Sequence, residues 1–259
     1  MMEGGYVLAG ALTGLMVSLT GVGGGSMMTP ILLLVFGIAP ATAVATDLWF
    51  AAITKMVAIP IGGGMKQVDW PVVRRLWGGS LPVAAGVVVL VGIGLKMHRS
   101  GWLTQAIGIA VLITAAGLLL GPSFMAKVRQ RPSEPASTIR AWQPGLTVLS
   151  GAFLGLCVAL TSVGAGALGC VMLVYLYPQR MTPHRLVATD IMHAIPLTVV
   201  AGLGYLFAGQ VNGPVLASLL TGSVPAVVVG RLIAGKCHAR WLQLALAVML
   251  LVTGIKTLV

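Results

Sequence analysis

Charged residues are scarce in this chain. They make up 8% of its 259 residues, and only five are acidic, whereas soluble domains carry about 25%. The longest polar stretch is also short, covering residues 121–143. Together these features exclude a sizeable soluble domain. The three cysteines, Cys157, Cys170 and Cys237, form no CxxC pair. We therefore expect packed thiols rather than a metal or redox site, and no cofactor.

Apolar residues dominate instead. They account for 58% of the chain, and the run 102–120 carries no charge, which approaches the roughly 20 residues of a membrane-spanning helix. The formal net charge is +11. We assign it to short cytoplasmic loops rather than to nucleic-acid binding, because no basic cluster alternates with aromatic residues. The first residues also lack the basic start of a cleavable signal peptide. The sequence thus predicts an all-α polytopic protein in a lipid bilayer.

The sequence contains two related halves. Residues 44–47, Val-Ala-Thr-Asp, recur 143 residues later at 187–190, and the Gln-Val pair at 67–68 recurs at 210–211. The glycines at 23 and 25 recur at 164 and 166. We predict a first transmembrane repeat over 1–121, a flexible cytoplasmic linker over 122–143 and a second repeat over 144–259. Duplicated apolar halves are typical of transporters whose substrate site lies between the halves.

About five helical segments fit each half. They cover 4–20, 25–36, 41–62, 71–95 and 102–120, and then 145–161, 166–177, 184–208, 213–234 and 240–258. Glycine-rich motifs at 21–26 and 162–167 separate the first two segments of each half. A single helix over 4–36 would be about 50 Å long, against a hydrocarbon core of about 30 Å. Consecutive glycines also weaken helices. We therefore expect broken or hairpin helices at both motifs.

The basic residues favour inverted repeats. If each hairpin returns to the side it left, each half crosses the membrane an odd number of times. One side then carries Lys66, Arg74, Arg75, Lys127, Arg129, Arg131, Arg140, Arg180, Arg185, Arg231, Lys236 and Arg240, and the other carries Lys96, Arg99 and Lys256. A single crossing at each motif would leave no such bias. By the positive-inside rule, the two repeats are inverted and both termini are periplasmic.

Two GxxxG pairs flank the breaks. Gly10 and Gly14 lie in the first half, and Gly151 and Gly155 lie at the equivalent positions of the second. Such pairs allow helices to approach closely. They are compatible with internal packing and with a homodimer.

The glycine-rich breaks are candidate anion-binding sites. A break exposes backbone N–H groups at the start of its second arm, and the helix dipole there attracts negative charge. The candidate substrate ligands are Thr20, Gly23, Gly24, Gly25, Ser26, Thr161, Ser162, Gly164 and Gly166, together with Lys55. Lys55 follows Asp47 by eight residues, so both can share a helix face. The alternatives are that the glycines serve only close packing and that Lys55 snorkels to the interface.

Asp47 and Asp190 occupy equivalent positions of the two Val-Ala-Thr-Asp motifs. Ionisable residues inside a membrane are costly and usually serve a pathway, so we predict a coupling or gating role. The alternative is a carboxylate that caps a helix dipole. His193 lies one helical turn after Asp190 and is either a proton relay or a packed histidine.

Three motifs together resemble the TauE/SafE sulfite-exporter family. They are Gly-Val-Gly-Gly-Gly-Ser-Met-Met-Thr-Pro-Ile-Leu at 21–32, Pro-Ala-Thr-Ala-Val-Ala-Thr-Asp at 40–47 and Gln-Val-Asp-Trp at 67–70, with an echo at 183–190. The resemblance covers the whole chain. It implies a bacterial inner-membrane permease with two related halves that works without ATP hydrolysis and commonly exports sulfite or small organosulfur or carboxylate anions. The family's glycine-rich motif falls on Gly21, Gly23, Gly24, Gly25 and Pro30. The second half departs from it at Ala165 and Val171.

The sequence therefore predicts a secondary transporter rather than an enzyme. It would export sulfite or a related organosulfur anion across the bacterial inner membrane by alternating access, coupled to an ion gradient. A passive anion channel is an alternative. An intramembrane aspartyl protease using Asp47 and Asp190 is a remote one, because both aspartates lie in the same Val-Ala-Thr-Asp setting, without a Tyr-Asp or Gly-x-Gly-Asp context.

Overall fold

A computed structural model describes residues 2–20, 25–61, 64–96, 137–164, 166–178 and 180–233, with the single positions 105 and 112. Within these residues the chain is helical and contains no strand. The helices are α1 (Met2–Thr20), α2 (Gly25–Leu34), α3 (Pro40–Ala58), η1 (Gly64–Gln67), α4 (Trp70–Lys96), α6 (Ser137–Thr161), α7 (Ala167–Leu176), α8 (Pro183–Phe207) and α9 (Gly213–Ile233). The segments expected at 102–120 and 240–258, and Cys237, lie outside the described residues.

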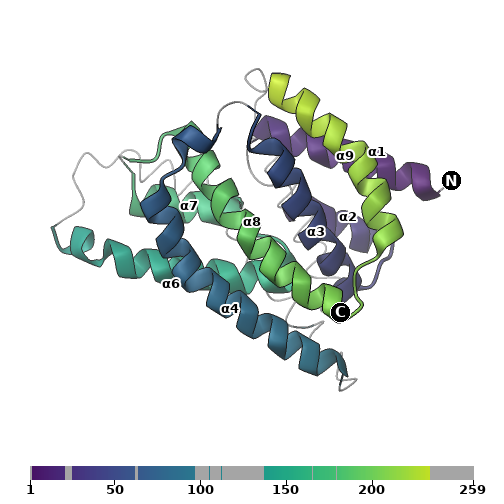
Figure 1. Cartoon of the computed structure of the whole chain (residues 1–259), viewed down its shortest axis with the longest axis horizontal. Coiled ribbons are helices and arrows are strands. Elements are labelled where there is room, and N and C mark those ends of the chain that lie inside the picture. The colour runs from purple at the N-terminus through teal and green to yellow at the C-terminus, as the bar shows by residue number, and fades with distance from the viewer. Residues whose placement is uncertain are drawn as a thin grey trace.

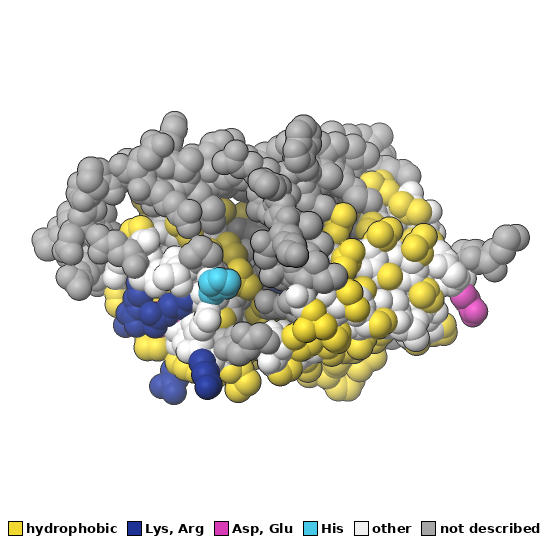
Figure 2. Space-filling view, turned by 90° about the horizontal axis from the view of Figure 1, so that it is seen from above, with side chains coloured by type: hydrophobic (Ala, Val, Ile, Leu, Met, Phe, Trp, Pro, Cys, Tyr) yellow, Lys and Arg dark blue, Asp and Glu magenta, His cyan; other side chains and the backbone are white. Residues whose placement is uncertain are grey.

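Five of these helices are long and apolar enough to cross a membrane. The spans are Pro40–Ala58, Trp70–Leu90, Trp142–Thr161, His184–Phe207 and Gly213–Gly230. Large apolar side chains face outward, for example Phe207 at 86% exposure and Leu232 at 76%. Figure 2 shows such side chains over much of the described surface, with Lys and Arg side chains gathered toward one end. Exposed apolar surface of this extent fits lipid rather than water. The predicted all-helical membrane protein is confirmed.

The two halves interlock. The central helices α3 and α8 lie between the pair α1–α9 on one side and the pair α4–α6 on the other (Figure 1). Each outer pair joins one helix of the first half to one of the second. Leu48, Leu197 and Tyr205 belong to the apolar core shared by the two halves and are fully buried. The core thus forms between the halves, and neither half buries it alone.

Glycines allow the outer pairs to approach closely. A Cβ on Gly79 of α4 would overlap the Val148 carbonyl of α6, and a Cβ on Gly222 of α9 would overlap the Val7 carbonyl of α1. The two contacts are equivalent positions of the two halves. Gly10, Gly14, Gly151 and Gly155 lie just as closely against Leu219, Ser223, Leu76 and Ser80, in that order. The close packing expected of both GxxxG pairs is therefore confirmed, and it lies within one chain.

Both predicted helix breaks are present. Helix α1 ends at Thr20 and α2 begins at Gly25, while α6 ends at Thr161 and α7 begins at Ala167. The second break uses the left-handed backbone region at Ser162 (φ 59°), Gly164 (121°) and Gly166 (128°). Glycine takes such angles without a Cβ clash, whereas Ser162 is held there at a cost. At the second break, Gly164 and Gly166 therefore interrupt the helix as the sequence predicted.

Helix α6 begins at Ser137, inside the stretch 122–143 that we expected to be a flexible linker. Residues 137–143 are therefore helical. The helix passes through Pro144, although a proline removes one intrahelical hydrogen bond and disfavours the helical conformation of the residue before it. The division into two repeats with inverted topology stays a prediction.

Candidate functional site

Asp47 joins the central helix α3 to the short helix α2. Its Oδ2 accepts hydrogen bonds from the Thr29 backbone N–H at 3.1 Å and from the Thr29 hydroxyl at 2.5 Å. Both side chains are fully buried. The carboxylate therefore fixes α2 against α3 in a region that water does not reach.

Asp190 has the corresponding role in the second half. Its Oδ1 accepts a hydrogen bond from the backbone N–H of Gly166, the residue before α7, at 3.1 Å. Gly169 lies so close that a Cβ there would overlap the same oxygen. Asp190 thus caps the positive end of α7, the helix-capping alternative of the sequence analysis. Capping does not exclude transport, since the N–H group it occupies is one an anion would use.

The threonine of each Val-Ala-Thr-Asp motif also has a structural role. The Thr189 hydroxyl accepts a hydrogen bond from the Asp69 backbone N–H at 3.0 Å, and the Thr46 hydroxyl accepts one from the Asn212 N–H at 3.3 Å. These contacts are again equivalent, and each connects one half to the start of a long helix in the other. The sequence analysis missed this role, although the repetition of the threonine was a signal for it.

Lys55 is the buried cation of the site. Its side chain on α3 is only 1% exposed, so it points into the protein and does not snorkel. Lys55 and Asp47 lie on α3, which packs against α8 and its Asp190, and both aspartates are buried as well. Within the described ranges, no ion pair of 4.0 Å or less joins Lys55 to either aspartate. One ammonium group thus lies in the field of two carboxylates from opposite halves.

The second break reaches the same place. The Thr161 carbonyl accepts a hydrogen bond from the Thr29 hydroxyl at 3.2 Å, and the Ser162 side chain approaches Asp47. Of the buried oxygens without a well-aligned hydrogen-bond partner among the described residues, three belong to this site: Asp47 Oδ1, Asp190 Oδ2 and Ser162 Oγ. Buried polar atoms are normally paired. Unpaired ones around a lysine therefore mark a place for a proton, a water or a ligand.

His193 packs toward α4. Its Nε2 lies 3.0 Å from the Ser80 hydroxyl, and its backbone carbonyl accepts a hydrogen bond from the Trp77 indole at 3.2 Å. The ring is fully buried. These contacts fit the packed-histidine alternative and connect α8 to α4.

The first break is described only at its edges. Thr20 is the last residue of α1, and Gly25 and Ser26 are the first two of α2. Gly23 and Gly24 lie outside the described residues, as do the side chains of Thr20 and Ser26. The structure therefore brings together Asp47, Asp190, Lys55, Thr161, Ser162 and Gly166, with Gly164 in the same break, and leaves the first break a prediction.

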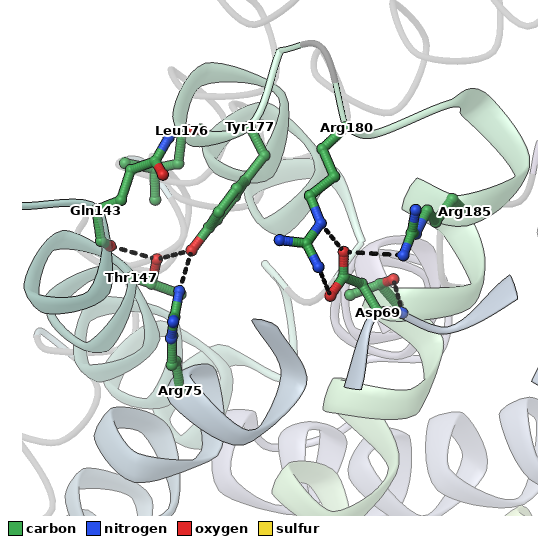
Figure 3. Close-up of polar contacts among 9 residues, drawn as sticks. Asp69, Arg75, Gln143, Thr147, Leu176, Tyr177, Arg180 and Arg185 are labelled. Atoms are coloured by element: carbon green, nitrogen blue, oxygen red, sulfur yellow. Dashed lines mark hydrogen bonds and ion pairs between the residues drawn. The ribbon is translucent and has the colours of Figure 1, made fainter. Parts of the chain in front are cut away.

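An ion cluster at one end was also missed. The Asp69 carboxylate is fully buried and pairs with Arg180 Nε at 2.7 Å and Arg185 Nη2 at 3.3 Å (Figure 3). Asp69 belongs to the first half and both arginines to the second. Its equivalent position in the second half carries the uncharged Asn212. Arg185 corresponds to Thr42 in the first half. The Thr42 hydroxyl donates a hydrogen bond to Gln210 Oε1 at 3.3 Å.

A second polar connection lies beside this cluster. Arg75 donates a hydrogen bond to the Tyr177 hydroxyl at 3.2 Å, and that hydroxyl lies 2.8 Å from the Thr147 hydroxyl (Figure 3). It ties α4, α6 and the end of α7 together. Among the described residues, no three His, Cys, Asp or Glu side chains lie close enough to hold a metal ion.

Comparison with known proteins identifies relatives over nearly the full length. The model of the family "Sulfite exporter TauE/SafE" matches residues 6–257. The "Probable membrane transporter protein YjnA" of Bacillus subtilis (strain 168) is 33% identical over 254 residues, which cover 96% of this chain and 97% of the relative. No solved structure gives a significant match.

Proposed function

Because the chain belongs to the TauE/SafE sulfite-exporter family, we propose that it is a secondary transporter that exports sulfite or a related organosulfur anion. Transport occurs across the bacterial inner membrane by alternating access, is coupled to the movement of an ion and involves no enzyme chemistry. The two repeats are inverted, so the same fold can open to either side.

The observation that carries this proposal is the buried Lys55 between two carboxylates. An anion in a low-dielectric interior needs a cation, and Lys55 supplies it from the centre of the interlocked halves. The N–H groups at the second break add a positive helix end. The substrate therefore binds beside Lys55, at the edge of α7.

The charges also suggest the coupling ion. Two ionised carboxylates and one ammonium leave a net negative site, which repels an anion. Protonation of one aspartate makes the site neutral, and protonation of both makes it positive. Asp190 already occupies the Gly166 N–H that an anion would use, so its protonation frees that group. We therefore assign Asp47 and Asp190 to proton coupling. In the absence of substrate, their carboxylates occupy the groups that would otherwise bind the anion.

Reconstitution tests this proposal. Purified protein in proteoliposomes is supplied with radiolabelled sulfite, with and without an imposed pH gradient. We expect saturable flux that rises with the gradient and that loses this dependence in Asp47→Asn and Asp190→Asn. The exposed acid Glu3 provides a matched control, because Glu3→Gln should behave like the wild type. If sulfite flux does not depend on the pH gradient in the wild type or in any variant, Asp47 and Asp190 have no role in coupling and serve only to cap helices.

Two further measurements separate the alternatives. A carrier shows counterflow of unlabelled anion, whereas a passive channel does not. Replacement of Gly24 by leucine should abolish flux if the first break contributes to the site, and unchanged flux at normal expression would contradict that role. No sulfite flux in the wild type would direct the assay to organosulfonates and small carboxylates.

A further inference from the structure

A cavity of about 410 Å³ lies beside the ion cluster, away from the central site. Its lining residues are Lys66, Gln67, Thr182, His184 and Arg185. Lys66 and Gln67 come from η1 in the first half, whereas the other three come from the start of α8 in the second. Arg185 belongs both to this cavity and to the ion pair with Asp69. The cavity and the contact between the halves are therefore physically connected.

Positive charge is in excess here. Lys66, Arg180 and Arg185 carry three positive charges, and Asp69 supplies one negative charge in its two ion pairs. Two positive charges therefore remain beside the cavity. Side chains of one sign that line a concave surface concentrate counter-ions. The basic lining of the cavity therefore favours a small oxyanion as its ligand over a cation or an apolar molecule.

Arg185 is the more weakly held of the two arginines. Its Nη2 lies 3.3 Å from Asp69 Oδ2, whereas Arg180 contacts the same oxygen through Nε at 2.7 Å and also bonds Asp69 Oδ1 through Nη2 at 3.2 Å. A shift of Arg185 toward the cavity would still leave Asp69 paired with Arg180. Arg185 can thus exchange one negative partner for another without leaving the buried carboxylate alone, which would be costly.

We propose that this cavity recruits the transported anion at the basic end, and that the anion competes with Asp69 for Arg185. The inference rests on the proposed function and extends it. Occupation of the cavity removes one of the two ion pairs between the halves. Arrival of the substrate thereby weakens the contact between the halves at this end, so that the end can open. The phosphate of an anionic lipid has the same chemistry, and the experiment must distinguish it from free anion.

Sulfite uptake into inside-out membrane vesicles tests the proposal. We expect Lys66→Gln to raise the KM for sulfite about two- to fivefold, the range for an exposed charge, with Vmax unchanged. The control is Arg74→Gln, an exposed arginine at the same end that does not line the cavity, and its KM should stay at the wild-type value. Higher ionic strength should raise KM in the wild type more than in Lys66→Gln.

Asp69→Asn tests the competition. Removal of the competing carboxylate should lower KM, and Lys66→Gln should reduce this gain in the double variant, because both changes act on one site. Equal KM values in wild type, Lys66→Gln and Asp69→Asn would overturn the inference.

A change of lipid composition distinguishes a free anion from the phosphate of an anionic lipid as the ligand of the cavity. The same proteins are reconstituted with phosphatidylcholine alone or with added phosphatidylglycerol. An effect of Lys66→Gln that occurs only with phosphatidylglycerol would assign the cavity to lipid and overturn the inference, whereas an effect in both supports it. Absence of sulfite flux in the wild type would contradict the proposed function. That result differs from unchanged KM values in a protein that transports sulfite, which would contradict only the role of the cavity.

Discussion

Replacement of Asp69 by asparagine should open the basic end of the protein. Asparagine occupies the equivalent position, 212, in the second half, so the change makes the two ends alike. The asparagine side chain retains hydrogen-bonding atoms but loses the charge that holds Arg180 and Arg185. The backbone N–H at 69 keeps its bond to Thr189. The perturbation is therefore confined to the ion pairs between the halves.

The burial of the partners sets the magnitude. Removal of one member of a fully buried pair costs about 3–5 kcal/mol, whereas exposed pairs contribute at most about 1 kcal/mol. Asp69 is fully buried, but the side chains of Arg180 and Arg185 are 47% and 39% exposed. We therefore expect the closed conformation to lose about 1–2 kcal/mol, which is about a five- to thirtyfold rise in the open-to-closed ratio.

Cys170 is a native reporter of opening. It lies on α7 next to Asp190 and Lys55 and is only 6% exposed. With Cys157 and Cys237 changed to serine, a charged maleimide added to inside-out vesicles should label Cys170 about five to thirty times faster in Asp69→Asn than in the parent. Asn212→Asp, which has no arginine at the equivalent positions, should label at the parent rate. Equal labelling in Asp69→Asn and the parent, in folded protein, would refute the gating role.

Three further predictions concern the framework and the central site. Gly169→Ala should lower sulfite flux more than tenfold, because its Cβ would overlap Asp190 Oδ1, whereas Gly145→Ala on α6, where a Cβ meets nothing within 4 Å, should leave flux unchanged. In thermal unfolding, Gly79→Ala and Gly222→Ala should each destabilise the protein by about 1–3 kcal/mol, because each Cβ would overlap a carbonyl of the facing helix. The neighbouring Gly78→Ala has open space and should be neutral or slightly stabilising. Lys55→Met should abolish sulfite binding measured by calorimetry while the protein still folds, since methionine keeps much of the buried volume without the charge; retained binding would remove Lys55 from the site.

Local patterns in the sequence predicted the framework well. Consecutive glycines weaken a helix wherever they occur, so the positions of both breaks could be predicted from the sequence alone. The GxxxG pairs predicted close helix contacts for an equally local reason, the missing Cβ. The start of α6 was less predictable, because Pro144 marks an expected helix boundary and yet lies inside the helix.

Contacts between the halves were harder to predict. Asp69 and Arg180 are 111 residues apart, and no local pattern connects them. Thr46 and Thr189 stood out as repeated residues, but their partners depend on how the two halves interlock. Lys55 could be placed on one face with Asp47 from its spacing, whereas its proximity to Asp190 required the contact between α3 and α8. Charges across the repeat interface are thus a tertiary property.

Apart from the bonds of Asp47 and Asp190 to the second arm of each break, the duplicated contacts are uncharged and the charged ones are not duplicated. Gly79 and Gly222 make the same backbone contact, and Thr46 and Thr189 accept the same type of hydrogen bond. Lys55, by contrast, corresponds to Thr198. The packing contacts are therefore similar at the two ends of the protein, whereas the charged contacts differ between them. It follows that substitutions in the packing framework should have similar effects in either half, whereas those at Lys55 and Asp69 should have no equivalent in the other half.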